Sequence, residues 1–128
     1  MITEIPQSFT SPIVCEIAND GKSYTLQVPF AYYRKDNPNS QIIVPLGFKS
    51  DGFTNFGFHS FIPKYGRGLK CAILHDYLCE QFHKGEISRK EADSIFLESL
   101  LETKAFSKPK CYVLYGAVRL YALLKNYK

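Results

Sequence analysis

The chain has 128 residues, 45% of them hydrophobic, and its 16 basic and 12 acidic residues give a formal net charge of +4. This composition fits one domain with an apolar core, spanning 1–128, and no run of about 18 apolar residues predicts a membrane span. The positive charge is mild and dispersed, so nucleic acid is not an expected partner. The N-terminus lacks the pattern of a signal peptide and the four cysteines show no CxxC spacing, which favours reduced thiols in a cytoplasm.

The first part of the chain, residues 1–46, is predicted to be rich in β structure. Two short β-prone runs at 13–18 and 23–29 flank an Asp-Gly pair, which is a strong hairpin signal. Residues 30–34 are predicted to extend the second run, and a polar turn separates them from a further run at 41–45. We therefore expect an antiparallel sheet of three to four strands.

Residues 47–68 form a glycine- and phenylalanine-rich stretch without helical or strand periodicity. A loop of this length in a small domain is more often functional than not. Asp51 followed by Gly52 offers a carboxylate and a sharp turn, a combination that suits calcium, although an ordinary turn is the alternative. The phenylalanines line an apolar pocket or an interfacial surface, or they belong to the core.

The remainder, residues 69–126, is predicted to be helical. Two helices at 68–83 and 88–103 place His75 and Asp93 on their apolar stripes, at core-facing spacing. Burying either group without a partner would cost a few kcal/mol, so we expect the helices to pack antiparallel with His75 meeting Asp93. Asp76 is rotated by roughly 100° from His75 and can hold a cation beside the imidazole.

Two local signals support the helix boundaries. Ser88 and Glu91 form a capping box at the start of the second helix. A third helix is predicted from 108 or 109 to 126, with an apolar stripe that packs across the other two. Arg119 lies off the centre of this stripe, where it either reaches Asp93 or Asp76 or remains a solvated surface arginine.

The predicted fold class is α+β, with an N-terminal sheet and a three-helix C-terminal half.

The motifs PLGFKSD, AILHDYL, SRKEADSIFLESL and YVLYGAVRLYALL resemble a family of phage and prophage proteins known as domain of unknown function thirteen fifty-three. The resemblance covers about residues 24–123. The chain departs from the family pattern where Phe53 begins the run that replaces Ala-Ser-Val-Pro, and where Cys79 stands in place of Tyr. The resemblance implies a phage- or prophage-encoded accessory protein, located in the host cytoplasm or associated with the virion.

The helical half is also similar to the secreted phospholipases A2 of bacteria and fungi, in which a His-Asp helix packs antiparallel to a helix that carries Asp. This resemblance implies that His75 is a general base and that Asp93 orients its imidazole. It further implies that Asp76 binds calcium, together with carbonyls or the carboxylate around Asp51, so that the ion stabilises the oxyanion of an ester. These lipases are disulfide-braced and carry a Gly-rich calcium loop directly ahead of the His-Asp helix, whereas in this chain the cysteines show no pairing pattern and a predicted β-hairpin sheet precedes the loop.

Three functions remain open at this point. The first is a calcium-dependent hydrolase with a lipid or ester substrate. The second is a non-enzymatic accessory or virion-associated domain, bound to a phage structural protein, in which His75 and Asp93 form a structural bond. The third is a protein that binds and neutralises a host protein. Buried His-Asp pairs are common structural devices, so the pair alone does not choose among them.

Overall fold

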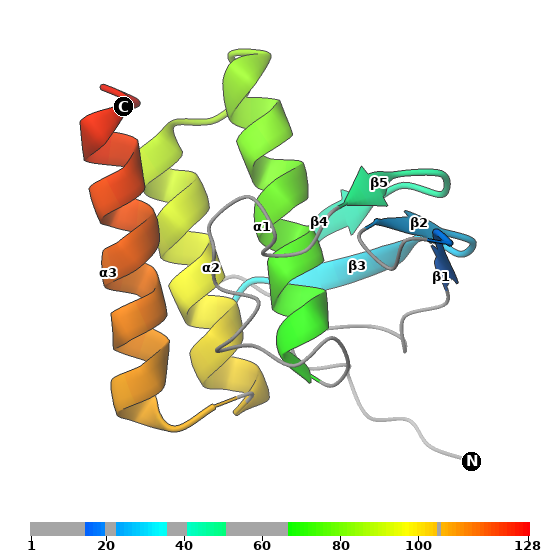
Figure 1. Ribbon diagram of the computed structural model, residues 1–128, viewed down its shortest axis with the longest axis horizontal. Helices are drawn as coiled ribbons and strands as arrows, with labels where there is room; N and C mark the ends of the chain where they lie inside the picture. Colours follow the sequence, from blue (N-terminus) through cyan, green and yellow to red (C-terminus); the bar gives the residue numbers. More distant parts are fainter. Residues whose placement is uncertain (1–14, 20–22, 36–40, 51–66, 105) are drawn as a thin grey trace.

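The computed structural model describes residues 15–19, 23–35, 41–50, 67–104 and 106–128, which form an α+β fold with strands first and helices after (Figure 1). The elements in chain order are β1 (Cys15–Ile17), β2 (Tyr24–Leu26), β3 (Phe30–Tyr33), β4 (Gln41–Val44), β5 (Lys49–Ser50), α1 (Arg67–His83), α2 (Arg89–Thr103) and α3 (Lys108–Leu124). The predicted fold class is confirmed. The predicted loop at 47–68 contains β5 and the first residues of α1, and its residues 51–66 lie outside the described part.

The predicted hairpin is present, since β1 and β2 pair antiparallel with Cys15 opposite Leu26. The other edge of β2 pairs with β5, which gives the strand order β1-β2-β5. A turn at Gly47, whose φ is +85°, brings β5 back to β2, and the amide of Gly47 donates to the carbonyl of Leu26 at 2.9 Å. Glycine suits this position because other residues rarely adopt a positive φ. With only two residues, β5 has no periodicity that the sequence could reveal.

The run at 30–34 does not extend β2, contrary to the expectation from the sequence. A bend at residues 27–28 and Pro29 separate it from β2, and β3 pairs instead with β4 in a two-stranded sheet of its own. Proline has no N–H to donate to a ladder, so a strand that reaches Pro29 is interrupted there. The antiparallel strands thus form two small sheets.

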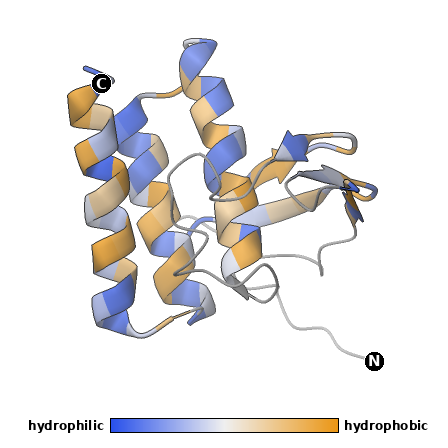
Figure 2. Cartoon of the chain, viewed as in Figure 1, coloured by the Kyte–Doolittle hydropathy of each residue, from blue (hydrophilic) through white to orange (hydrophobic). Residues whose placement is uncertain are grey.

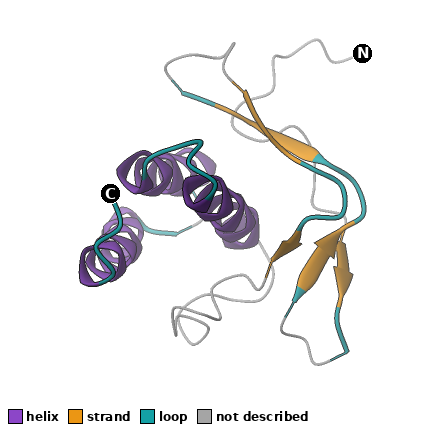
Figure 3. Ribbon diagram, turned by 90° about the horizontal axis from the view of Figure 1, so that it is seen from above, coloured by secondary structure: helices purple, strands orange, loops and turns teal. Residues whose placement is uncertain are grey.

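The helices lie together on one side of the strands (Figure 3). α1 and α2 run antiparallel, and α3 packs against α2 (Figure 1). Ser88 is the N-cap of α2 and its hydroxyl accepts a hydrogen bond from the amide of Glu91 at 3.0 Å, as the capping box predicts. Within the described residues, no helix has both the length and the apolar character that a membrane span requires.

Apolar side chains are buried in two clusters that share the helix pair. One joins the strands to α1 and α2 and includes Tyr32, Val44 and Ile73. The other lies among the three helices and includes Phe96 and Val118. The apolar stripe predicted for α3 is only partly buried, because Leu124 is 76% exposed (apolar stretches of α3 are orange in Figure 2).

Candidate functional site

Antiparallel packing of α1 and α2 brings His75 and Asp93 together in the interior. The Nε2 atom of His75 lies 2.7 Å from Oδ1 of Asp93, so the predicted hydrogen bond is present. The two residues are 1% and 0% exposed. The ring of His75 also packs on that of Phe96, with 4.6 Å between the ring centroids. The pair is therefore a buried contact between two helices.

Two arginines complete the hydrogen bonding of the same carboxylate. Arg89, one turn before Asp93 on α2, donates from Nε to Oδ1 at 3.0 Å. Arg119, on α3, donates from Nη1 to Oδ2 at 2.7 Å, which settles the choice left open by the sequence in favour of Asp93. We call His75, Arg89, Asp93 and Arg119 the Asp93 network. It draws donors from all three helices to one carboxylate.

The electrostatics of the Asp93 network fix its protonation. Burial lowers the pKa of His75 and outweighs the hydrogen bond to Asp93, which acts in the opposite direction. Burial by itself would raise the pKa of Asp93, but the hydrogen bond from His75 and the contacts with Arg89 outweigh it, and the pKa lies below its ordinary value. Asp93 is therefore an anion at neutral pH and His75 is neutral. Since an ionised carboxylate only accepts, Nε2 of His75 carries the proton and donates it to Asp93.

Cys79 is the neighbour of the imidazole on its own helix. Its Sγ atom lies 3.6 Å from Nε2 and 3.8 Å from Nδ1 of His75. Burial raises the pKa of the Cys79 thiol to about 12. A thiol with that pKa is almost wholly protonated at neutral pH, so Cys79 lacks the thiolate that a cysteine nucleophile needs.

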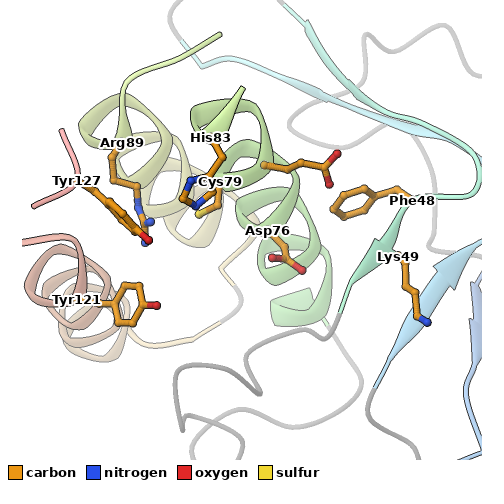
Figure 4. Close-up of a pocket in the computed structure, with 9 residues that line it drawn as sticks. Phe48, Lys49, Asp76, Cys79, His83, Arg89, Tyr121 and Tyr127 are labelled. Carbon is orange, nitrogen blue, oxygen red and sulfur yellow. The ribbon is translucent and has the colours of Figure 1, made fainter. Parts of the chain in front are cut away.

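A cleft of about 300 Å³ adjoins the Asp93 network (Figure 4). Its α1 wall carries Asp76, Cys79 and Glu80, and Arg89 with the rings of Tyr121 and Tyr127 forms the opposite side. The volume is at the lower end of the range typical of small-molecule sites. Asp76 therefore faces the cleft, whereas His75 and Asp93 lie behind its wall.

The predicted metal ligands are Asp51 and Asp76, of which Asp76 belongs to the described residues. Asp51 lies outside the described residues, so its approach to Asp76 stays a prediction. Within the described residues no group of three or more His, Cys, Asp or Glu side chains gathers as a metal site. Calcium takes six to eight oxygen ligands. Backbone carbonyls and water also serve as calcium ligands, so the predicted calcium site depends on Asp51 and stays a prediction.

The role of Arg89 in this site was missed from the sequence. It stands four residues before Asp93, the spacing at which oppositely charged side chains meet on a helix, and that signal could have identified the contact. The position of Tyr127 at the cleft could not be predicted from a helical spacing of this kind. Tyr127 reaches the cleft because its amide donates to the carbonyl of Ala122 at 2.8 Å, after Asn126 adopts a positive φ of 58°.

Comparison with known families matches most of the chain to a family model. A family model described as "Protein of unknown function (DUF1353)" matches residues 24–118, a range that includes β2 to β5, the whole α1–α2 pair and most of α3. The comparisons with the curated proteins and with the solved structures found no match. The matched range contains three members of the Asp93 network and ends one residue before Arg119.

Proposed function

We propose that this chain, which belongs to the family of proteins of unknown function just described, is a phage- or prophage-encoded accessory protein that acts by binding and not by catalysis. The observation that carries the proposal is the hydrogen bonding of Asp93, both of whose carboxylate oxygens accept from side chains of the helices, His75, Arg89 and Arg119. In this proposal, the Asp93 network is a structural bond that holds α1, α2 and α3 in register.

The burial of the Asp93 network supports a structural role. His75 and Asp93 are 1% and 0% exposed and do not line the cleft, so a water molecule or a substrate has little access to the pair. A buried ion pair is retained where its partners satisfy one another, and removing one partner leaves a costly unpaired charge. Three donors from three helices on one acceptor also select a single packing arrangement, since a shift of any helix breaks a charged hydrogen bond.

Encoding by a phage or prophage is supported by the resemblance of the motifs around His75, Asp93 and Arg119 to proteins of that source. The partner in this proposal is a phage structural protein or a host protein. The protein then works in the host cytoplasm or on the virion. A pull-down from cells infected by the encoding phage, repeated with purified virions, tests both locations.

The test of the binding proposal measures catalysis and stability on the same variants. The change is His75→Gln, with His83→Gln as the control, because His83 is an exposed histidine on the same helix without a contact to Asp93. We expect no release of fatty acid from mixed phospholipid micelles by the native protein, with or without a calcium chelator. We expect His75→Gln to lose about 1 to 3 kcal/mol of unfolding free energy, since it disturbs a buried hydrogen bond. Release by the native protein that His75→Gln abolishes would overturn the proposal.

One observation favours a second candidate, an ester hydrolase. The pKa of His75 is lowered, so the imidazole is neutral at neutral pH, and it holds Asp93 through Nε2. Nδ1 then carries the lone pair, the state that a general base requires. In this candidate His75 takes a proton from water and Asp93 holds the tautomer.

The ester-hydrolase candidate includes a calcium ion, which we propose is bound by Asp51 and Asp76. Calorimetry with calcium on the native protein and on Asp76→Asn tests it, with Glu80→Gln as a control on the same wall of the cleft. If the protein is a calcium-dependent hydrolase, we expect the native protein and Glu80→Gln to bind calcium and Asp76→Asn not to bind it. Absence of calcium binding to the native protein at millimolar calcium would contradict calcium-dependent hydrolysis.

A further inference from the structure

The side chain of Arg89 is buried but incompletely hydrogen-bonded. It is 1% exposed, and its Nε atom donates to Asp93. Its Nη2 atom is also buried and has no hydrogen-bond partner within the described residues. Buried polar groups without a partner are rare in native structures, and a charged one is costly. Because Arg89 lines the cleft, this N–H group has a place where a ligand atom can meet it.

Charge within the Asp93 network is also unbalanced. Arg89 and Arg119 carry two positive charges, and both hold the single negative charge of Asp93. His75 is neutral, so the network has a net charge of +1. A ligand with one negative charge would balance it and would supply the missing acceptor.

The guanidinium group is held in a fixed position by aromatic rings. Its central carbon lies 5.7 Å from the ring centroid of Tyr121 and 5.4 Å from that of Tyr127. Figure 4 shows the end of the Arg89 side chain beside these rings, at the edge of the cleft. A planar guanidinium that is stacked and bound at Nε loses little entropy when it binds an acceptor through its remaining N–H groups.

The other charges of the cleft limit the charge of a ligand. Asp76 and Glu80 line its α1 wall, and Glu80 is paired with Lys84 at 3.2 Å. Lys49 stands on the strand side and adds one positive charge. A polyanion that filled the cleft would meet the α1 carboxylates, whereas a single anionic group at Arg89 would stay beside Tyr121 and Tyr127.

We infer that the cleft binds a small organic monoanion, whose carboxylate accepts a hydrogen bond from Nη2 of Arg89 and whose apolar body lies against Tyr121 and Tyr127. This site goes beyond the proposed function, because it requires only the position of Arg89 and holds whether the His75–Asp93 pair is structural or catalytic. An aromatic carboxylate fits best, since the rings of Phe48, Tyr121 and Tyr127 line the cleft.

Benzoate is the probe for the test, with acetate and inorganic phosphate as comparisons. Calorimetry on the native protein should show binding of benzoate that is tighter than that of acetate or phosphate. Acetate lacks the apolar body, and phosphate is largely a dianion at pH 7.5. Arg89→Lys keeps a positive charge but removes Nη2, and should weaken benzoate by about tenfold or more, as expected for a lost charged hydrogen bond. Arg34→Lys is the matched control, because Arg34 pairs with Glu91 and Glu98 away from the cleft, and it should leave the affinity unchanged.

If Arg89→Lys does not fold, nuclear magnetic resonance on the native protein alone tests the inference. The side-chain N–H resonances of Arg89 should shift as benzoate is added, whereas those of Arg34 should stay in place. Equal benzoate affinity in the native protein and folded Arg89→Lys would overturn the inference. So would unmoved Arg89 resonances at millimolar benzoate, or phosphate binding more tightly than benzoate.

Discussion

Two charged networks lie on different faces of α2 and differ in how deeply they are buried. The Asp93 network faces α1 and α3. The second, which we call the Glu98 network, joins α2 to the strands: Glu98 accepts from the hydroxyl of Tyr32 at 2.5 Å and from Nε of Arg34 at 3.3 Å. The side chain of Asp93 is 0% exposed, whereas those of Glu98 and Arg34 are 17% and 28% exposed. Similar chemical groups thus occupy two different environments.

The difference in burial determines what each network contributes. Water can approach the ion pair of Glu98 with Arg34, which lies near the surface, and ion pairs near the surface are worth about 0 to 1 kcal/mol. Water cannot reach Asp93, so its pairs yield little net stability when intact but are costly to break. The buried network therefore specifies how the helices pack, while the partly buried one adds a modest link between strand and helix.

The largest expected effect comes from removing the buried charge. Asp93→Asn keeps the volume but leaves Arg89 and Arg119 without a counter-charge, so we expect a loss of about 3 to 5 kcal/mol in the free energy of unfolding. Glu98→Gln is the matched change in the other network, and should cost about 1 kcal/mol or less. Urea denaturation of the two variants and the native protein measures both values. Equal losses would show that burial does not separate the networks.

The next effect is a dependence of stability on pH that only the buried network predicts. The pKa of His75 is lowered in the folded protein, while in the unfolded chain it is about 6.5. Between these two values the unfolded chain binds more protons, so stability falls as the pH decreases below about 6.5, by at most about 1.4 kcal/mol per pH unit. Above that pH the contribution of His75 is constant.

His75→Gln isolates this dependence. Denaturation of the native protein and the variant from pH 7.5 to 5 should show a smaller slope in the variant, because the titrating group is absent. His83→Gln, on the same helix, should keep the native slope. If the native protein and His75→Gln have parallel pH profiles, His75 titrates in the folded state as it does in the unfolded chain, and a lowered pKa of His75 is ruled out.

The core of the Asp93 network could be predicted from the sequence because helical periodicity carries the information. His75 and Asp93 stand on apolar stripes where a polar group needs a partner, and the capping box at Ser88 fixes where α2 begins. Arg119 could not be assigned in the same way, since an arginine at the edge of a stripe serves equally well in solvent. Only the packing of α3 against α2 decides that it reaches Asp93.

The Glu98 network could not be predicted at all from local patterns. Tyr32 and Glu98 are 66 residues apart, and their contact depends on how the β3–β4 sheet is placed against α2. That placement follows from the interruption at Pro29, after which residues 30–33 form β3 in a separate sheet. The prediction that residues 30–34 extend β2 did not take Pro29 into account. The predicted role of Asp51 stays a prediction, because Asp51 lies in residues 51–66, outside the described part of the chain.

The smallest expected effect tests the link between strand and helix. Tyr32 is 0% exposed, and its pKa is raised by burial and further by its hydrogen bond to Glu98, so the hydroxyl remains a donor at any pH at which the protein is studied. Tyr32→Phe removes this donor but leaves Glu98 paired with Arg34, so the expected loss is about 1 kcal/mol, with no change in the pH slope that His75 produces. Tyr33→Phe is the control, since the next residue of β3 points to the other face of the strand and should change stability by less than about 0.5 kcal/mol. Urea denaturation of Tyr32→Phe, Glu98→Gln and the double variant gives the coupling between the two groups. A coupling near zero would mean that the hydroxyl does not hold Glu98 in solution, and that apolar packing alone joins β3 to α2.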